Sequence, residues 1–296
     1  MDNEFIIIDQ AYKYEVDEVL EGGIGFVRLM SLREFSRRPP EGAMALQYSG
    51  EKYPYRNQLA AKTIKSSEGM DCFAKACVHW AELKDTGIVP LLKVVKIGGE
   101  ILALMPRCAG NLRSLMQSGS YTARDLLRAL CPVIASLSKV YTDYRMVHQA
   151  LKPENILYCQ RNQKLVFELS DWGIAGVQAC LLPDSGSERF GALDAYGILP
   201  YLAPERFDNY ISNVRADIFS LGMIVFEILA DCLPYHEESS IAEQITSGEY
   251  YKKVERTLFE ISNEKFVSVV LRMLYPDTNK RMQEYGELLA LLDTLL

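Results

Sequence analysis

The chain has 296 residues, of which 49% are hydrophobic and 24% are charged, as is ordinary for a globular protein that buries a sizeable core. Its formal net charge of −7 argues against nucleic acid as the main partner, because contacts to phosphate need a basic surface. The longest apolar run, residues 221–230, is far shorter than the roughly 20 residues that span a membrane.

The first third of the chain is predicted to be rich in β-strands. A glycine cluster at residues 22–25 separates the first two strands, and the polar, proline-containing residues 36–57 predict a long loop. Ser66 and Ser67 open a helix that runs to about residue 84. The predicted strands are residues 12–20, 26–32, 58–64, 89–95 and 101–105.

After Pro106 the pattern becomes helical, with two short strands at residues 156–157 and 165–169. The predicted helices are residues 112–116, 123–140, 216–229, 241–245, 266–274 and 282–296. We therefore expect a small β-rich lobe followed by a larger helical lobe, with the boundary near residues 105–109.

The compartment is predicted from the N-terminus and the cysteines. The start is acidic, and the apolar run at residues 5–8 is too short for a secretory signal. The seven cysteines include no C-x-x-C pair, so they suggest neither a disulfide framework nor a zinc site. We expect free thiols in a reducing cytoplasm.

Two early features suggest phosphate binding without deciding it. Glycines at residues 22–25 let backbone amides approach phosphate oxygens, but a plain hairpin turn explains them equally well. A dinucleotide site would need a helix next, and residues 26–30 predict a strand instead. Lys62, at the end of a strand, can reach phosphates, although a lysine in such a place is usually a surface residue.

Three later motifs are more specific. Residues 148–157 read His-Gln-Ala-Leu-Lys-Pro-Glu-Asn-Ile-Leu, residues 170–173 read Ser-Asp-Trp-Gly, and residues 200–205 read Pro-Tyr-Leu-Ala-Pro-Glu. Asn155 and Asp171 carry the hard oxygen ligands that Mg²⁺ prefers. A capped loop explains any one motif, but nothing structural requires the set in this order.

The set resembles the motifs of the eukaryotic-type protein kinase family across nearly the whole chain, and Lys-Pro-Glu-Asn resembles its serine/threonine branch. The resemblance implies an α+β fold of two lobes within one domain. Residues 1–105 would form a β-rich N-lobe with one main helix and a long insert at about 34–57. Residues 106–296 would form a larger helical C-lobe, with an activation segment at 171–205.

Catalytic roles follow from the resemblance, position by position. Lys62 is expected to contact the α- and β-phosphates of ATP, and Lys152 to neutralise the moving phosphoryl group. Asn155 and Asp171 are expected to hold Mg²⁺.

The resemblance also assigns the adenine site and two structural marks. Leu104 takes the gatekeeper position, and residues 105–107 form the hinge that bonds adenine through backbone groups. Asp217 is a mark of the family, as is Arg281, which is expected to pair with Glu205. The residues expected around ATP are Gly22, Gly23, Gly25, Val27, Ala60, Lys62, Leu104, Met105, Arg107 and Leu157.

The main departure from the family is Ala150, which stands where a catalytic aspartate orients the substrate hydroxyl and accepts its proton. A methyl group does neither, and loss of a positioned base typically costs about 10²–10⁴-fold in rate. Natural loss, giving a pseudokinase, and deliberate substitution are the two explanations. We favour substitution, because Lys62, Lys152, Asn155 and Asp171 all remain.

A second departure lies in the helix after Lys62, where Ala76 takes the position of the glutamate that pairs with this lysine. No acid lies three or four residues from Ala76, and Glu82 points about 120° away. Lys62 is then expected to pair with Asp171 or with ATP directly.

Two further departures concern regulation and packing. Gln149 replaces an arginine that binds an activation-loop phosphate in many relatives, so control by phosphorylation there is not expected. Trp172 replaces a phenylalanine and is expected to stack with His148 and Trp80. The insert at 34–57 is a candidate partner-binding flap.

The leading hypothesis is an ATP- and Mg²⁺-dependent serine/threonine protein kinase in an inactivated form. The alternative is a natural pseudokinase, a nucleotide-binding module that acts through a protein partner. A small-molecule kinase is disfavoured by Ala203-Pro204-Glu205, which in the family belongs to the platform for peptide substrates.

Overall fold

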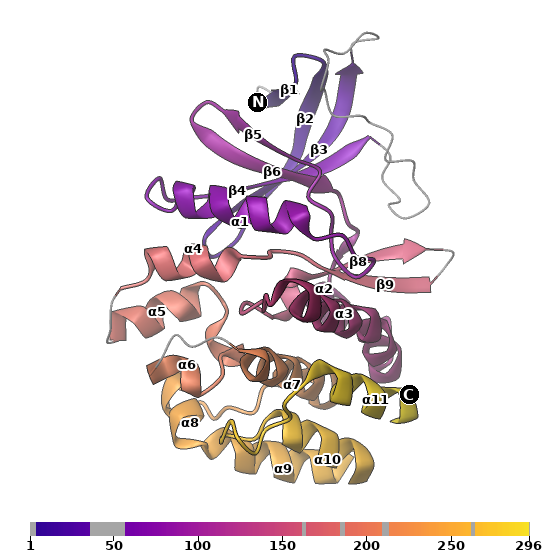
Figure 1. The fold of residues 1–296 in the computed structure, drawn as a ribbon, viewed down its shortest axis with the longest axis vertical. Helices are drawn as coiled ribbons and strands as arrows, with labels where there is room; N and C mark the ends of the chain where they lie inside the picture. The colour runs from indigo at the N-terminus through magenta and orange to yellow at the C-terminus, as the bar shows by residue number, and fades with distance from the viewer. Residues whose placement is uncertain are drawn as a thin grey trace.

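The computed structural model describes residues 4–35, 57–161, 164–183, 187–208, 213–261 and 264–295. It has two parts: a β-sheet with one long helix, and a larger, mainly helical part below it (Figure 1). The predicted α+β, two-lobed architecture is confirmed. Nearly all of the predicted long loop at residues 36–57 lies outside the described residues.

The N-terminal sheet has six antiparallel strands in the order β1-β2-β3-β4-β6-β5. Side chains alternate between its faces. One face buries its own cluster, including Tyr14, Met30 and Ala61, and the other joins the main core through Ala60 and Met105. The strands are β1 (Phe5–Ile8), β2 (Tyr12–Glu21), β3 (Gly25–Phe35), β4 (Gln58–Ile64), β5 (Lys93–Ile97) and β6 (Glu100–Pro106).

The helix α1 (Met70–Glu82) lies between β4 and β5 in the chain and buries Phe73, Cys77 and Trp80. The predicted strand at residues 89–95 was placed too early, because β5 begins at Lys93. The N–H of Val89 instead donates to the carbonyl oxygen of Leu169 in the other lobe (3.1 Å). This segment therefore ties the two lobes together.

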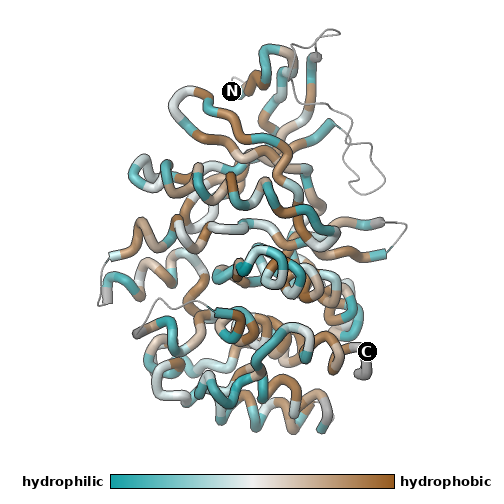
Figure 2. The backbone as a smooth tube through the Cα atoms, viewed as in Figure 1, coloured by the Kyte–Doolittle hydropathy of each residue, from teal (hydrophilic) through white to brown (hydrophobic). Residues whose placement is uncertain are grey.

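The helical lobe is built around α7, whose buried residues include Phe219, Leu221 and Phe226. Side-chain caps at Asn111, Thr122, Asn213 and Ser240 start α2, α3, α7 and α8 by accepting backbone N–H groups. Figure 2 shows hydrophobic and hydrophilic residues alternating along the outer helices. The helices are α2 (Leu112–Ser118), α3 (Ala123–Tyr144), α7 (Val214–Ala230), α8 (Ile241–Ser247), α9 (Glu249–Ile261), α10 (Glu264–Met273) and α11 (Tyr285–Leu295).

A second sheet joins the lobes, with β7 (Gly110–Asn111), β8 (Ile156–Arg161) and β9 (Lys164–Leu169) in that order. The short helix η1 (Pro153–Asn155) precedes β8, and η2 (Leu199–Tyr201) and α6 (Glu205–Asp208) precede α7. Within the described residues, no helix is both long enough and apolar enough to cross a membrane.

The largest difference from the predicted elements lies between β9 and η2. The turn-rich composition there predicted a loop, but the chain forms α4 (Ile174–Leu181) and α5 (Ser187–Ala195). Ile174, Ala175 and Val177 are buried, so tertiary packing gives α4 the apolar cover that a loop would lack. The strand β1 and the helix α9 were also missed.

Candidate active site

Lys62 and Asp171 meet between the lobes. Lys62 lies on β4, one residue from Ala61 and on the opposite face of the sheet, and its ammonium forms an ion pair with the Asp171 carboxylate. Both side chains are largely buried, at 13% and 11% exposed. Asp171 has a left-handed backbone (φ 65°), which turns its carboxylate away from the direction of β9. The expectation that Lys62 pairs with Asp171 is confirmed.

The glycine cluster forms the turn between β2 and β3. The N–H of Gly22 donates to the carbonyl of Gly25 (2.8 Å). A Cβ on Gly25 would lie 2.0 Å from the Thr63 carbonyl oxygen, one residue from Lys62, so only glycine fits there. The cluster and the lysine are therefore fixed to each other through β3 and β4.

The catalytic loop at residues 148–155 is held by Asp217, which is fully buried at the start of α7. Its carboxylate accepts the backbone N–H groups of His148 (2.6 Å) and Gln149 (2.7 Å) and the hydroxyl of Tyr285 (2.9 Å). Gln149 has φ 67°, so the loop bends sharply there. Two charge-assisted backbone contacts on one carboxylate explain why this position needs an aspartate.

His148 connects the loop to the Asp171 motif. Its Nε2 donates to the Ser170 carbonyl (2.8 Å), and its Nδ1 accepts the N–H of Ala150 (3.3 Å). Burial lowers the pKa of the imidazole, so the ring is neutral, as these two bonds require. Its ring contacts Trp172, as predicted, but edge-on rather than stacked, with 4.9 Å between the ring centroids.

The predicted stacking between Trp172 and Trp80 is not among the ring contacts of the described residues. Trp80 is buried on α1, and its indole N–H donates to the Val89 carbonyl (2.8 Å). Both tryptophans lie in the core shared by the lobes. Trp80 thus supports the joint between the lobes through a backbone bond.

Asn155 and Lys152 lie on the same loop as Ala150. The side-chain amide of Asn155 donates to the Ala150 carbonyl (2.8 Å). The backbone carbonyl of Asn155 accepts the N–H of Ser170 (2.9 Å). Asn155 therefore lies beside the backbone that carries Asp171. Lys152 donates to the carbonyl oxygen of Tyr196 (2.6 Å), and burial lowers the pKa of its ammonium.

Leu104 does not face the cleft, the space between the lobes where Lys62 and Asp171 meet. It is fully buried on the other face of the N-terminal sheet, with Met30 and Ala61. Because side chains alternate along a strand, its neighbours Ala103 and Met105 face the main core and the cleft. The assignment of Leu104 as gatekeeper is wrong by one residue, and Met105 takes the cleft-facing place.

The other residues expected around ATP come from both lobes. Val27, Ala60 and Leu157 pack in the main core cluster beside Met105. The side chain of Arg107 instead forms an ion pair with Asp17 on β2 (3.1 Å).

Ala76 faces the start of α4. A Cβ on Gly173 would lie 3.0 Å from the Ala76 Cβ, so there is no room here for a longer side chain. The position expected for a glutamate is thus filled by the activation segment.

The lower edge of the site is anchored by Arg281. Its side chain is fully buried, and it donates to both carboxylate oxygens of Glu205 (2.7 and 3.0 Å), which confirms the predicted pair. Arg206 donates to the carbonyl of Gln149 (2.7 Å) and so fastens this region to the catalytic loop.

Arg113 was not singled out from the sequence. It forms ion pairs with Glu154 (2.9 Å) and with Glu227, whose carboxylate also accepts the Tyr201 hydroxyl (2.7 Å). Glu227 interrupts the longest apolar run of the chain, and this interruption was the available signal. A charge inside a buried helix needs a partner.

The cysteine prediction needs one correction. Cys72 on α1 and Cys180 on α4 form a disulfide, although 108 positions separate them. The other five, Cys77, Cys108, Cys131, Cys159 and Cys232, are free thiols as expected.

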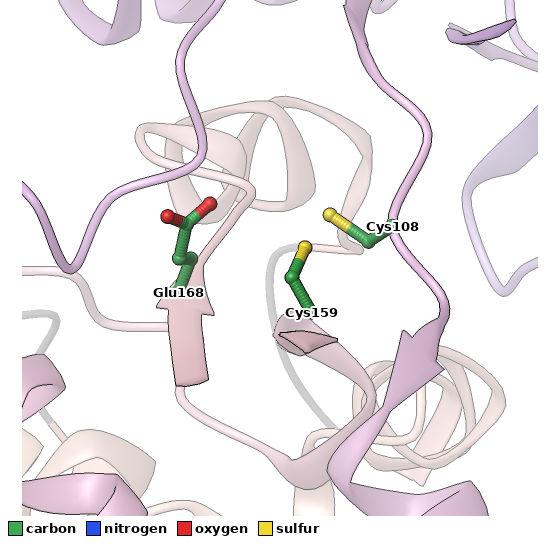
Figure 3. A group of neighbouring side chains, drawn as sticks. All are labelled: Cys108, Cys159 and Glu168. Atoms are coloured by element: carbon green, nitrogen blue, oxygen red, sulfur yellow. The ribbon is translucent and has the colours of Figure 1, made fainter. Parts of the chain in front are cut away.

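A separate group of possible metal ligands lies where the lobes join. The ligand atoms of Cys108, Cys159 and Glu168 all lie within 4.8 Å of one another, from the linker after β6 and from β8 and β9 (Figure 3). Among the described residues this group supplies three ligands, whereas structural zinc sites use four. It contains neither Asn155 nor Asp171.

Comparison with known proteins decides the family. Residues 41–289 match the family model described as protein kinase domain. The chain belongs to the protein kinase family. The fold described above is therefore a kinase domain, in which Lys62 and Asp171 form an ion pair between the lobes.

Three similar proteins are kinases by name, and one of the names specifies a serine/threonine-protein kinase. The chain is 24% identical over 291 residues to a putative ribosomal protein S6 kinase alpha-2 of Caenorhabditis elegans, covering 91% of this chain and 34% of that protein. It is 23% identical to a serine/threonine-protein kinase H1 homolog of Danio rerio, covering 92% and 61%. It is 30% identical to a calcium/calmodulin-dependent protein kinase type 1 of Caenorhabditis elegans, covering 73% and 67%. The chain thus spans from about a third to two thirds of the length of these relatives.

Proposed function

We propose that this kinase domain binds ATP with Mg²⁺ and belongs to the enzymes that transfer the γ-phosphoryl group to serine or threonine hydroxyls of proteins. The form described is inactivated, because Ala150 occupies the position of the catalytic base. The observation that carries the proposal is the meeting of Lys62 and Asp171 between the lobes. A buried ion pair at this place has little value for stability alone. It does place a cation and a hard anionic ligand beside a glycine turn.

The donor set fits Mg²⁺. Asp171 supplies a carboxylate and Asn155 an amide oxygen, both hard ligands, and the bond from Ser170 to Asn155 holds their backbones together. When bound, the metal would neutralise charge on the phosphates. Lys62 would then release Asp171 and contact the α- and β-phosphates.

The remaining residues divide the work of transfer. Lys152 would give up its bond to Tyr196 and neutralise the moving phosphoryl group. Ala150 would leave the substrate hydroxyl without an acceptor for its proton, at a cost of about 10²–10⁴-fold in rate. Residues 1–105 and 106–296 are proposed as the two lobes of this one domain, and the cytoplasm as its location.

A second candidate is a pseudokinase that binds nucleotide and acts through a protein partner. Ala76 favours it, because α4 fills the place where an acidic partner of Lys62 is expected. On this reading the chain binds nucleotide but lacks two groups needed for transfer.

The test is intact mass after incubation with ATP and Mg²⁺, on the chain as it stands and on Ala150→Asp. Phosphates added only to Ala150→Asp, in steps of about 80 Da, would support the disarmed kinase. The control is Ala150→Asp combined with Lys62→Met, which should stay unmodified.

The melting temperature of each variant with and without ATP separates the remaining outcomes. A Ala150→Asp protein that is folded and stabilised by ATP but never modified, itself or with added protein substrates, would select the pseudokinase. Absence of any effect of ATP on folded protein would reject both candidates.

A further inference from the structure

The helix α4 lies along α1 in the opposite direction and is packed closely against it (Figure 1). At its start, Gly173 meets Ala76, where an added Cβ would lie 3.0 Å away. At its end, Leu181 meets Gly69, where a Cβ added to the glycine would lie 3.1 Å from the Leu181 Cδ1 atom. Small residues, Ala76 on α1 and Gly69 just before it, therefore permit the close approach of α4 at both of its ends.

The disulfide between Cys72 and Cys180 joins these two helices covalently. Cys180 is exposed and Cys72 half-buried, so small thiols and disulfides in solution can reach the bond. Cys77, one turn further along α1, is buried, and burial raises the pKa of its thiol to about 12. The redox-reactive cysteines on this face are thus Cys72 and Cys180, whereas the Cys77 thiol is unreactive.

A later part of the activation segment, at Ala195 and Tyr196, lies between the two lobes. A Cβ on Gly23 of the glycine turn would lie 2.6 Å from the Tyr196 Cα and 2.7 Å from the Ala195 carbonyl oxygen. From the other lobe, the ammonium of Lys152 bonds to the Tyr196 carbonyl (2.6 Å). The backbone at Tyr196 therefore fills the space between the glycine turn and the catalytic loop.

The helix α4 faces α5, the helix that leads to Tyr196. Ala175 and Gln178 of α4 face Arg189 and Leu193 of α5 across a cavity of only about 10 Å³. The N–H of Ile198, just past the cleft-filling residues, donates to the carbonyl of Leu193 (3.1 Å). Movement of α4 away from α1 would thus disturb α5 and the backbone beside Tyr196.

We propose that Cys72 and Cys180 are a redox-controlled modification site whose disulfide holds the activation segment in the cleft and restricts nucleotide binding. The proposal rests on the proposed nucleotide site for its consequence, but the lock itself is a property of α1, α4 and α5. Reduction removes the covalent link between α1 and α4, so that noncovalent packing alone, including that of the buried Ile174 and Val177, holds α4, and the cleft can then open.

The chemistry is thiol–disulfide exchange with a small disulfide such as oxidised glutathione. The thiolate of one cysteine attacks a sulfur of the reagent and expels one glutathione thiolate. The thiolate of the second cysteine then attacks the mixed disulfide and expels the other. Two protein thiols lose two electrons and two protons, and one oxidised glutathione becomes two reduced molecules. A dithiol reductant reverses both steps.

The experiment compares the full chain after oxidation with oxidised glutathione and after reduction with a dithiol. Peptide mapping without reductant should find Cys72 joined to Cys180 only in the oxidised sample. Amide hydrogen exchange of residues 174–181 should be roughly tenfold faster after reduction. A fluorescent ATP analogue with Mg²⁺ should bind roughly tenfold more tightly, because the open state is no longer a minor one.

Two variants make the result specific. Cys180→Ser should behave as the reduced protein under both conditions, because it cannot form the bond. Cys232→Ser removes an exposed thiol elsewhere and should keep the full difference between oxidised and reduced protein. A difference that survives in Cys180→Ser would overturn the proposal.

The outcomes separate this proposal from the proposed function. If exchange in α4 responds to reduction but no nucleotide binds in either state, the lock stands and the nucleotide site fails. If nucleotide binds equally in both states and exchange in α4 is unchanged, the lock is wrong while the nucleotide site stands.

Discussion

The catalytic loop and the α1–α4 contact are held in different ways. At the catalytic loop, the buried carboxylate of Asp217 accepts two backbone N–H groups and one hydroxyl. At the α1–α4 contact, Ala76 and Gly173 touch through small apolar surfaces, and one disulfide supplies the fastening.

The difference indicates which region is permanent. Breaking a buried charge–backbone network leaves unsatisfied polar groups, so any other conformation of the loop is high in free energy. The contact of Ala76 with Gly173 contains no buried charge that separation would leave unpaired, and the disulfide beside it is reversible in solution. We infer that the loop is a fixed frame and that the α1–α4 contact is the conditional part of the domain.

The largest expected effect concerns the buried pair Arg281–Glu205, which anchors the segment that Arg206 fastens to the catalytic loop. Arg281→Met should lower the free energy of unfolding by about 3–5 kcal/mol, because it leaves Glu205 without its buried partner. Urea denaturation measures this value. The control is Arg272→Met, which breaks the exposed pair with Glu287 and should cost at most about 1 kcal/mol. Equal losses in the two variants would contradict a frame built on buried pairs.

The next effect concerns the fastening. Reduction of the Cys72–Cys180 bond should lower the free energy of unfolding by about 2–4 kcal/mol, because the bond closes a long loop in the unfolded chain. Cys180→Ser should show the lower stability with or without reductant. A wild-type protein whose denaturation midpoint ignores reductant would show that the bond does not form in solution.

A third change acts on one region alone. Ala76→Glu should cost about 1–3 kcal/mol, because α4 leaves no room for the longer side chain. Amide exchange should rise in residues 174–181 and stay unchanged in residues 148–155. Lys75→Glu adds the same acid on the exposed side of α1 and should leave both regions as they are. Faster amide exchange in both regions would show that the catalytic loop and the α1–α4 contact are not independent.

The smallest effect is a pH dependence of the fixed frame. Burial lowers the pKa of His148 in the folded state, so the unfolded chain takes up its proton first. The contribution is present above the unfolded pKa near 6.5 and is lost as pH falls toward the folded value, by up to about 1.4 kcal/mol per pH unit. Unfolding measured from pH 8 to pH 5 should show this loss relative to His148→Gln. Parallel pH curves for the two proteins would exclude a neutral, buried His148.

Much of the fold was predictable because its signals are local. The strand Gln58–Ile64 was placed correctly from its apolar run, and the helices α2, α3, α7, α8, α10 and α11 were located from their periodicity. The motif around Asp171 carried its chemistry in residue types, whereas the pair Glu205–Arg281 was predicted from the family resemblance and is confirmed. The one-residue error at Leu104 arose because the faces of a strand alternate, so any shift in alignment exchanges inside for outside.

The sequence by itself determined the order of the motifs, the alanine at position 150, and the apolar periods that build two lobes. Only the tertiary structure decided that residues 174–181 form a helix, that Cys72 finds Cys180, and that Tyr196 enters the cleft. Local residue patterns set the hydrophobic periodicity of each helix or strand and the chemical type of each side chain. These three features depend instead on which distant surfaces the folded chain brings together. Small residues on α1 matter only once α4 lies against them.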